Sequence, residues 1–334
     1  MGYERLSARA ASSLRRESRR SPEHVGSLAL FEAAPFLDER GRFRLDDARS
    51  HVAGRLHRWP ALRRRVQPVP FGQGRPVWVD DDRFDLTYHV RLTALPRPGR
   101  EEQLNALMAR LQTLPLDRRR PLWELWFVDG VEGDHVAVLQ KTHLALAHDR
   151  GAAGALEAVL DDEPCAQPLD APQWTARRVP NNAALLVHTL AERATRPAEM
   201  TGVARAALRG PRRALVAVGR RARPTVDVGS HLRYEVVRAT DASESDLRAA
   251  VRSHDTSVAI TFEALAAPRY LLGARLLEAF PYAPGAGSAS AVAALSYDGR
   301  TGIGLTGHRA AIAELRGLID GLGQGFGELD AAAG

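Results

Sequence analysis

Two apolar segments near the middle of the chain constrain its fold most strongly. They are LWELWFVDG (residues 122–130) and HVAVLQKTH (residues 135–143), and a turn that contains Gly130 and Gly133 separates them. Apolar runs of this length on both sides of a glycine-containing turn are typical of two paired strands. The pair therefore predicts a β-hairpin.

Strand and helix patterns alternate around this hairpin. Residues 25–31, 76–81 and 86–95 have strand patterns, whereas residues 46–59 and 100–114 carry apolar residues at helical spacing. The alternation predicts a mixed α/β lobe over residues 1–162.

The pattern changes after residue 162. Prolines at 164, 168, 172 and 180 precede a helical pattern at residues 181–194, and no acidic residue occurs between Glu199 and Asp227. We predict a Pro/Arg-rich helical linker over residues 163–230.

Strand patterns at 232–240, 290–299 and 301–307 then predict a second lobe over residues 231–334. The arginine-rich stretch at 200–223 is either a solvated helical face or a helix that lies on a membrane surface.

Charge and cysteine content limit the classes of function that the chain can have. The formal net charge is +6, but Lys141 is the only lysine, so arginine-biased coding explains the charge at least as well as an anionic partner does. No zinc-finger, helix-turn-helix or RNA-binding signature is present, which argues against nucleic acid as a partner. The single Cys165 excludes an intramolecular disulfide and a cysteine-based metal cluster. With no secretory signal and no run of ~18 apolar residues, we expect a cytoplasmic protein without a metal or cofactor.

A polar turn follows the second strand of the hairpin and contains His143, His148 and Asp149. Imidazole titrates near neutral pH, so a histidine in such a turn is a candidate general base. The competing interpretation is that each histidine is a turn or core residue with satisfied hydrogen bonds.

Five segments occur in a characteristic order along the chain. They are HVGSLALFE (24–32), WPALRRRV (59–66), PLDRRRPLWELWFVDG (115–130), the KTH turn (141–143) and LSYDGR (295–300). Together they resemble the bacterial wax ester synthase/diacylglycerol acyltransferase family. The resemblance implies an α/β fold of the CoA-dependent acyltransferase type, in which two mixed-sheet lobes are joined by the helical linker. It also implies a tunnel between the lobes where an alcohol attacks an acyl-CoA thioester, with acyl-CoA as substrate rather than cofactor.

The resemblance assigns roles to individual residues of this chain. The family signature HHxxxDG aligns without a gap to HLALAHD, so His143 takes the first histidine and Leu144 takes the second, which is the general base. His148 then takes the aspartate position and Asp149 the glycine position. If the strand continues to residue 144, His143 points to the opposite face, which leaves His148 as the better substitute base.

The segment PLWE supplies expected substrate-binding positions. These are Pro121, Leu122 and Trp123, together with Leu144 from the turn. A strand tryptophan beside leucines is more often a core residue, and we favour that role for Trp123.

The C-terminal half departs from the family pattern. No Asn-Asp pair occurs near residues 254–261, and APRYLLGARLLEAFP (267–281) resembles the stretch that follows the family's Asn-Val-Pro-Gly-Pro motif. We therefore expect a truncated second lobe.

Two main functions remain open from the sequence. The first is an acyl-CoA-dependent O-acyltransferase that makes wax esters or triacylglycerol, with impaired activity because the base is replaced. The alternative is a non-catalytic protein that binds an acyl chain or acyl-CoA, or that partners an intact family member. A third, a basic adaptor for nucleic acid or membranes, rests on arginine content alone. Peripheral binding to the inner membrane face or to lipid droplets is compatible with the first two, and the sequence does not indicate an oligomeric state.

Overall fold

The computed structural model describes residues 3–18, 21–148, 150–165, 171–195, 232–240, 245, 258–284 and 290–317. The α-helices are α1 (Ala8–Arg16), α2 (Leu45–Arg55), α3 (Leu86–His89), α4 (Glu101–Thr113), α5 (Leu144–Ala147), α6 (Gly154–Glu157) and α7 (Asn182–Thr195), and residues 309–317 are also helical. Short 3-10 turns are η1 (Ala34–Phe36), η2 (Leu56–Arg58), η3 (Pro60–Arg63) and η4 (Pro70–Gly72). The strands are β1 (Tyr3–Arg5), β2 (His24–Glu32), β3 (Arg64–Gln67), β4 (Val77–Asp80), β5 (Val90–Ala94), β6 (Trp123–Val131), β7 (His135–His143), β8 (Arg233–Thr240), β9 (Val258–Leu265), β10 (Tyr270–Leu271), β11 (Ala274–Tyr282), β12 (Ser290–Tyr297) and β13 (Arg300–Gly307).

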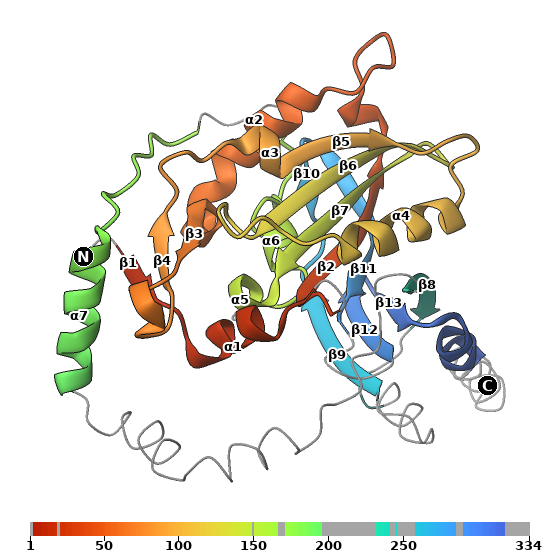
Figure 1. Cartoon of the computed structure of the whole chain (residues 1–334). Helices are drawn as coiled ribbons and strands as arrows, with labels where there is room; N and C mark the ends of the chain where they lie inside the picture. Colours follow the sequence, from red (N-terminus) through yellow and green to blue (C-terminus); the bar gives the residue numbers. More distant parts are fainter. Residues whose placement is uncertain are drawn as a thin grey trace.

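A six-stranded mixed sheet forms the centre of the fold, with the strand order β10-β11-β2-β7-β6-β5 (Figure 1). Strands β6 and β7 pair in antiparallel fashion with Trp126 opposite Leu139, which confirms the predicted hairpin. Gly130 and Gly133 both have positive φ, at 73° and 83°. Glycine adopts such angles without steric cost, which explains its presence at this turn.

Both faces of the central sheet are covered. Phe31 and Phe127 face a core shared with α2 and η1, whereas Leu28 and Leu139 face a second core shared with α4. Figure 1 shows α4 lying along one face of the sheet. A strand that is buried on both faces has a continuous apolar sequence, which explains the apolar run HVAVLQ in β7.

The predicted strand at residues 86–95 is partly wrong. Residues Leu86–His89 form the helical turn α3, and only Val90–Ala94 form β5, which runs parallel to β6. The side chain of Asp85 accepts a hydrogen bond from the backbone N–H of Thr87 at 2.9 Å. This N-cap offers the backbone a helical start that outweighs the strand propensity of the following residues.

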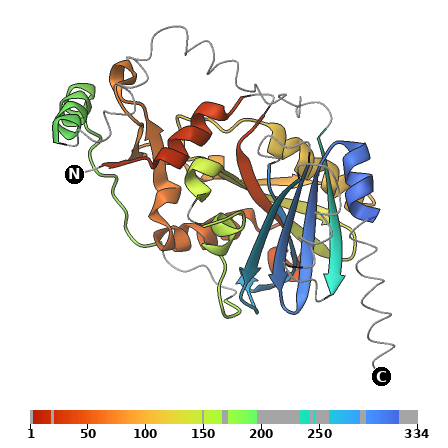
Figure 2. The same ribbon diagram turned by 90° about the horizontal axis from the view of Figure 1, so that it is seen from below.

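The second sheet has the strand order β8-β13-β12-β9, with β9 and β12 parallel and the other pairs antiparallel. Figure 2 shows these strands side by side, with the helical stretch at 309–317 packed against them. The mixed sheets confirm the predicted α/β class. Their strands β8, β12 and β13 match the strand patterns at 232–240, 290–299 and 301–307.

Glycines allow the two sheets to approach closely. A Cβ on Gly302 would overlap the carbonyl oxygen of Ala279, and one on Gly304 would overlap that of Pro281. Because β11 belongs to the first sheet and β13 to the second, only residues without a side chain fit at this crossing.

The C-terminal part of the chain also completes the first sheet. Strand β11 pairs with β2, and Asp161 forms a bridge with Tyr270. The guanidinium of Arg55, in α2, donates to both carboxylate oxygens of Asp161, and its Nε–Oδ1 distance is 2.8 Å. Because β11 belongs to the first sheet, the two sheets do not correspond to two consecutive parts of the chain. The predicted domain boundaries at residues 162 and 230 stay predictions.

Helix α7 confirms the helical pattern at residues 181–194 within the predicted linker. The arginine-rich stretch at 200–223 lies outside the described residues, so its two interpretations stay open. No helix in the described ranges is both long and apolar enough to span a membrane.

Candidate functional site at the turn after β7

The signature turn begins where β7 ends, at His143, and continues into the single helical turn α5. This confirms the prediction that His143 ends a strand. His143 keeps an extended backbone (φ −69°, ψ 139°), and its Nδ1 accepts a hydrogen bond from the backbone N–H of Ala145 at 2.9 Å. It therefore acts as the N-cap of α5. The N–H of Leu144 donates to the carbonyl of Glu23 at 2.8 Å, which holds the turn against β2.

The imidazole of His143 is completely buried. Because Nδ1 accepts a hydrogen bond, its lone pair is engaged, and the proton of the neutral ring lies on Nε2. Nε2 points toward Glu17, with its nearest carboxylate oxygen 3.4 Å away. Neither ring nitrogen is free to accept a proton from a substrate in this arrangement.

Glu17 is the centre of a buried polar cluster that the sequence did not reveal. Its carboxylate is 2.9 Å from Nε2 of His24, although the angle departs from ordinary hydrogen-bond geometry. Arg118 donates to the same carboxylate from Nη2 at 2.7 Å and from Nε at 3.2 Å. Burial raises the pKa of Glu17, but its contacts with His143, His24 and Arg118 outweigh burial and hold that pKa well below its usual range. Burial in turn lowers the pKa of His24.

This cluster connects two of the segments on which the family resemblance rests. Arg118 comes from PLDRRRPLWE, and His143 comes from the signature turn. Both reach the carboxylate of Glu17, which lies directly after α1. The arginine-rich segment therefore supports the turn from outside the hairpin.

Leu144, at the base position, has a partly buried apolar side chain. It packs against Val25, Ala147 and Ala152, so nothing at this position accepts a proton. Asp149 lies outside the described residues, and its predicted role is not addressed by the structure.

The PLWE residues belong to the interior. Pro121 is buried, and Leu122 and Trp123 have no exposed surface. Trp123 donates from Nε1 to the carbonyl of Leu62 at 2.7 Å and stacks on His89 with ring centroids 4.5 Å apart. The core role favoured for Trp123 is confirmed, while substrate binding by these residues and by Leu144 stays a prediction.

His148 lies at the end of α5 and is partly exposed. Its Nε2 is 3.0 Å from the hydroxyl oxygen of Ser13 on α1. It borders a cavity of about 810 Å³ between α1, the β1-β4-β3 sheet and α5, hereafter the α5 cavity. The lining residues are Glu4, Arg5, Leu6, Ser7, Ala10, Trp59, Pro60, Ala61, Arg64, Arg75, Trp78, Ala145, Leu146, His148 and Arg150. Of the two histidines of the turn, His148 is the one that faces this cavity.

Glu263, a residue that the sequence reasoning missed, ties the turn to the second sheet. Its carboxylate, on β9, accepts hydrogen bonds from the backbone N–H groups of Ala152 at 2.6 Å and Ala153 at 3.1 Å. A Cβ on Gly151 would collide with this carboxylate, and Gly151 has a φ of 73°. The positive φ therefore favours glycine just after the signature, and a larger residue there would also displace the Glu263 carboxylate.

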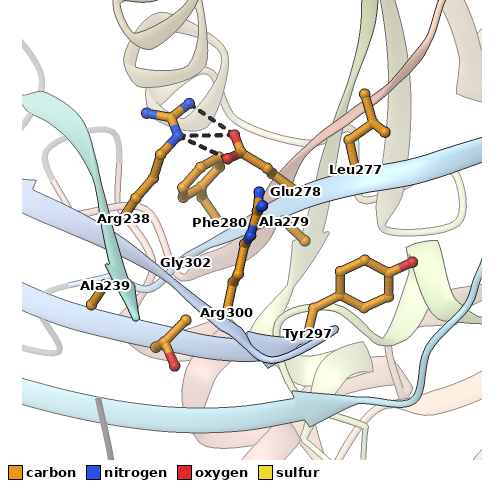
Figure 3. Close-up of a pocket in the computed structure, with 10 residues that line it drawn as sticks. Arg238, Ala239, Leu277, Glu278, Ala279, Phe280, Tyr297, Arg300 and Gly302 are labelled. Carbon is orange, nitrogen blue, oxygen red and sulfur yellow. Dashed lines mark hydrogen bonds and ion pairs between the residues drawn. The ribbon is translucent and has the colours of Figure 1, made fainter. Parts of the chain in front are cut away.

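A second cavity lies where β8, β11 and β13 meet, away from the signature turn (Figure 3). Arg238 forms an ion pair with Glu278 at 2.8 Å and another with Glu101 at 2.7 Å. Figure 3 shows Arg300 and Phe280 next to the Arg238–Glu278 ion pair. Two acidic partners thus offset the charge of Arg238. Within the described ranges, no group of three or more His, Cys, Asp or Glu side chains is arranged to hold a metal.

Comparison with known proteins identifies the relatives of this chain. Residues 6–264 match the family model of the wax ester synthase/diacylglycerol acyltransferase catalytic domain, and residues 265–330 match that of the WS/DGAT C-terminal domain. The probable diacylglycerol O-acyltransferase tgs3 of Mycobacterium tuberculosis is 38% identical over 195 residues, which cover 58% of this chain and 69% of that protein. The probable diacylglycerol O-acyltransferase tgs1 of the same organism is 42% identical over 139 residues, 42% of this chain and 28% of that protein.

Solved structures show the same fold at low sequence identity. The wax ester synthase/diacylglycerol acyltransferase from Marinobacter aquaeolei VT8 superposes with a TM-score of 0.62 at 19% identity, covering 99% of this chain and 100% of that one. A starter condensation domain of rhizomide synthetase RzmA, in complex with C8-CoA, gives 0.53 at 8% identity, covering 96% and 93%. The two mixed sheets of this chain thus form the same fold as in these two proteins. The chain belongs to the wax ester synthase/diacylglycerol acyltransferase family, which confirms the resemblance seen in the sequence.

Proposed function

We propose that this chain binds an acyl-CoA thioester but transfers the acyl group to a long-chain alcohol or diacylglycerol slowly or not at all. The observation that carries the proposal is the environment of the base position. Leu144 packs among apolar side chains, and the adjacent imidazole of His143 has its acceptor nitrogen engaged by Ala145. Family membership supports the substrate class.

The chemistry explains why the missing base matters. As the alcohol oxygen forms a bond to the thioester carbonyl carbon, its proton must leave, and the C–S bond then breaks to release CoA thiol. A positioned base typically accelerates such a step by ~10²–10⁴-fold. A site that still positions both substrates would retain only a residual rate. If that rate is zero, the protein acts by binding, either alone or with an intact family member.

His148 is the basis of the second candidate function, catalysis through a displaced base. Nε2 of His148 lies 3.0 Å from the hydroxyl oxygen of Ser13, and that oxygen also accepts a hydrogen bond from Nη2 of Arg16 at 3.2 Å. In the tautomer in which Nε2 donates to Ser13, Nδ1 carries the lone pair. This tautomer would leave a basic nitrogen on an imidazole that borders the α5 cavity.

An assay of purified protein separates these functions. Palmitoyl-CoA would be offered with hexadecanol or dioleoylglycerol while free thiol is followed, and binding of palmitoyl-CoA would be measured separately by calorimetry. We expect saturable binding with thiol release close to background. Rapid release that His148→Ala abolishes would overturn the proposal in favour of the displaced base. Absence of binding would refute it outright.

Restoration of the signature is the matching gain-of-function test. Leu144→His alone, and combined with His148→Asp and Asp149→Gly, reintroduces the family's residue types at the base, aspartate and glycine positions. We expect the triple variant to raise thiol release by roughly 10²-fold or more if the remaining site is intact. A folded triple variant that binds palmitoyl-CoA without turnover would favour a binding protein with a truncated second lobe.

Association with the inner membrane face or with lipid droplets is part of the same proposal. The arginine-rich stretch at 200–223 supports a peripheral, electrostatic contact from a cytoplasmic protein. Sedimentation with anionic liposomes should therefore decrease as salt rises from roughly 0.05 to 0.5 M. Pelleting that does not depend on salt would contradict it.

A further inference from the structure

The turn between β3 and β4 carries an apolar side chain that the fold leaves in solvent. Phe71, in η4, is 86% exposed, which is the highest value among the large apolar side chains that the structure describes. The next highest is Val187, at 62%, on α7. Helix α7 contacts η4, and Figure 2 shows both at the same end of the molecule. Single apolar side chains scattered over a surface are ordinary, but two on neighbouring elements indicate an interaction surface.

The backbone of Phe71 adopts a conformation that the fold alone does not favour. Its φ of 57° and ψ of 17° are left-handed, and this region is unfavourable for a bulky residue but open to glycine. The side chain contributes nothing to the buried core, so packing does not compensate for the strain. Strained residues of this kind are concentrated at functional positions. The combination of strain and exposure therefore points to a role outside the fold.

Few backbone donors of this turn need water. Pro68 and Pro70 have no N–H group, and the N–H groups of Gly72 and Gln73 donate to carbonyls within the turn, each at 3.3 Å. An unbonded N–H group makes transfer from water into lipid unfavourable, because nothing in the hydrocarbon replaces the lost water. The internal bonds and the prolines lower this cost. The turn is thus suited to leave water together with Phe71.

The charge pattern around the turn matches a lipid surface. No charged residue occurs at residues 66–74, whereas Arg65 precedes this stretch and Arg75 follows it. Aromatic rings favour the layer of lipid headgroups, and the long stems of flanking arginines let their guanidinium groups stay at the phosphates. A charge at the tip itself would oppose insertion. An uncharged aromatic tip with arginines on both sides therefore fits the surface of a phospholipid bilayer.

We infer that the turn between β3 and β4 inserts Phe71 into the interfacial layer of a phospholipid bilayer. This inference rests on the membrane association proposed above and adds to it a second contact, which depends on apolar burial rather than on charge. Salt screens charges but does not screen the burial of apolar surface. The contribution of Phe71 should therefore persist at salt concentrations that weaken the electrostatic contact.

Two substitutions of Phe71 test the contact without unfolding the protein. Phe71→Gly removes the ring and suits the left-handed backbone, so its melting temperature should equal or exceed that of the unaltered protein. Phe71→Trp keeps an aromatic ring that favours the lipid interface.

Sedimentation would use the full chain with vesicles of equal parts dioleoylphosphatidylglycerol and dioleoylphosphatidylcholine. Phe71→Gly should bind about tenfold more weakly than the unaltered protein, and Phe71→Trp should bind within about twofold of it. The tenfold ratio should be the same at roughly 0.05 and 0.3 M salt. Leu114→Ser, which changes a 51% exposed leucine after α4, is the matched control and should alter binding less than about twofold.

A fluorescent label reports insertion directly. In a Cys165→Ser background, Phe71→Cys would carry an environment-sensitive nitrobenzoxadiazole group, and Leu114→Cys would carry the same group as control. We expect the emission of the label at position 71 to brighten and shift to shorter wavelength when vesicles are added. The label at position 114 should stay unchanged, because that side chain remains in water.

The outcomes separate the insertion from the electrostatic contact. Equal vesicle binding of Phe71→Gly and the unaltered protein, or the same response of both labels, overturns the inference, while a decrease of binding with salt would still support the electrostatic contact. A tenfold loss in Phe71→Gly together with binding that does not depend on salt supports the insertion and refutes the electrostatic contact. Loss of self-association in Phe71→Gly with unchanged vesicle binding would assign the turn to a second copy of this chain and refute the inference. Absence of vesicle binding overturns both contacts and leaves the binding of acyl-CoA, which calorimetry measures separately, unaffected.

Discussion

The backbone N–H of Ala145 donates a hydrogen bond to Nδ1 of His143 across 2.9 Å. This contact makes the first histidine of the signature turn a helix cap and places its proton on Nε2, toward Glu17. The retained histidine thus caps the helical turn α5.

Replacement of His143 should affect stability in a way that depends on the acceptor. His143→Asn keeps a side-chain acceptor for the N–H of Ala145, whereas His143→Ala removes it. We expect His143→Ala to lower the free energy of unfolding by about 1 kcal/mol more than His143→Asn does, measured by urea denaturation. Equal losses for the two variants would show that the cap contributes nothing.

Loss of the Glu263 carboxylate should loosen the turn from the second sheet. Glu263→Gln replaces one acceptor oxygen by an amide group that cannot accept from Ala152 or Ala153. Because hydrogen bonds to charged acceptors contribute ~1.5–3 kcal/mol, hydrogen exchange at these two amides should accelerate about tenfold or more. Glu39→Gln, at an exposed loop position, serves as the control, and equal protection in both variants would argue against this role.

Acid should remove the contribution of Glu17. The pKa of this carboxyl is lowered in the folded protein, so its stabilising effect is fully present above the unfolded value of about 4.3 and is lost as pH falls toward the folded value. Glu17→Gln should therefore be less stable than the unaltered protein at pH 7, and the gap between their melting temperatures should narrow below about pH 4. A gap that stays constant with pH would contradict this sign.

His89 should make the fold less stable in mild acid. Burial lowers the pKa of this imidazole to about 4, while its hydrogen bond to the carbonyl of Trp123 at 2.7 Å opposes the shift. Between the unfolded pKa of about 6.5 and pH 5, the unfolded chain binds the proton and the folded one does not, which costs roughly 2 kcal/mol. His89→Gln keeps an amide donor and does not titrate, so its free energy of unfolding should fall less between pH 7 and pH 5. The same slope for both proteins would exclude His89 as a source of the pH dependence.

Much of the fold could be predicted because it is encoded locally. The β6–β7 hairpin follows from two apolar runs and two glycines, and α4 follows from helical spacing. The leucine at the signature's second histidine position, Leu144, was visible in the sequence alone. The turn α3 was missed because a single cap, Asp85, overrides the strand pattern that follows it.

The site itself depended on contacts between distant residues. Arg118 and Glu17 are 101 positions apart, and Glu263 and Ala152 are 111 apart, so no local period connects them. Arg118 and Glu17 meet beside His143 at the end of β7, whereas Glu263 reaches Ala152 from β9 of the second sheet. The sequence alone thus indicated most of the elements, the family and a leucine at the signature's second histidine position. Only the tertiary structure showed that His143 is buried beside Glu17 while His148 faces a cavity. The direction of each side chain and the position of its proton depend on the groups that packing places around the ring.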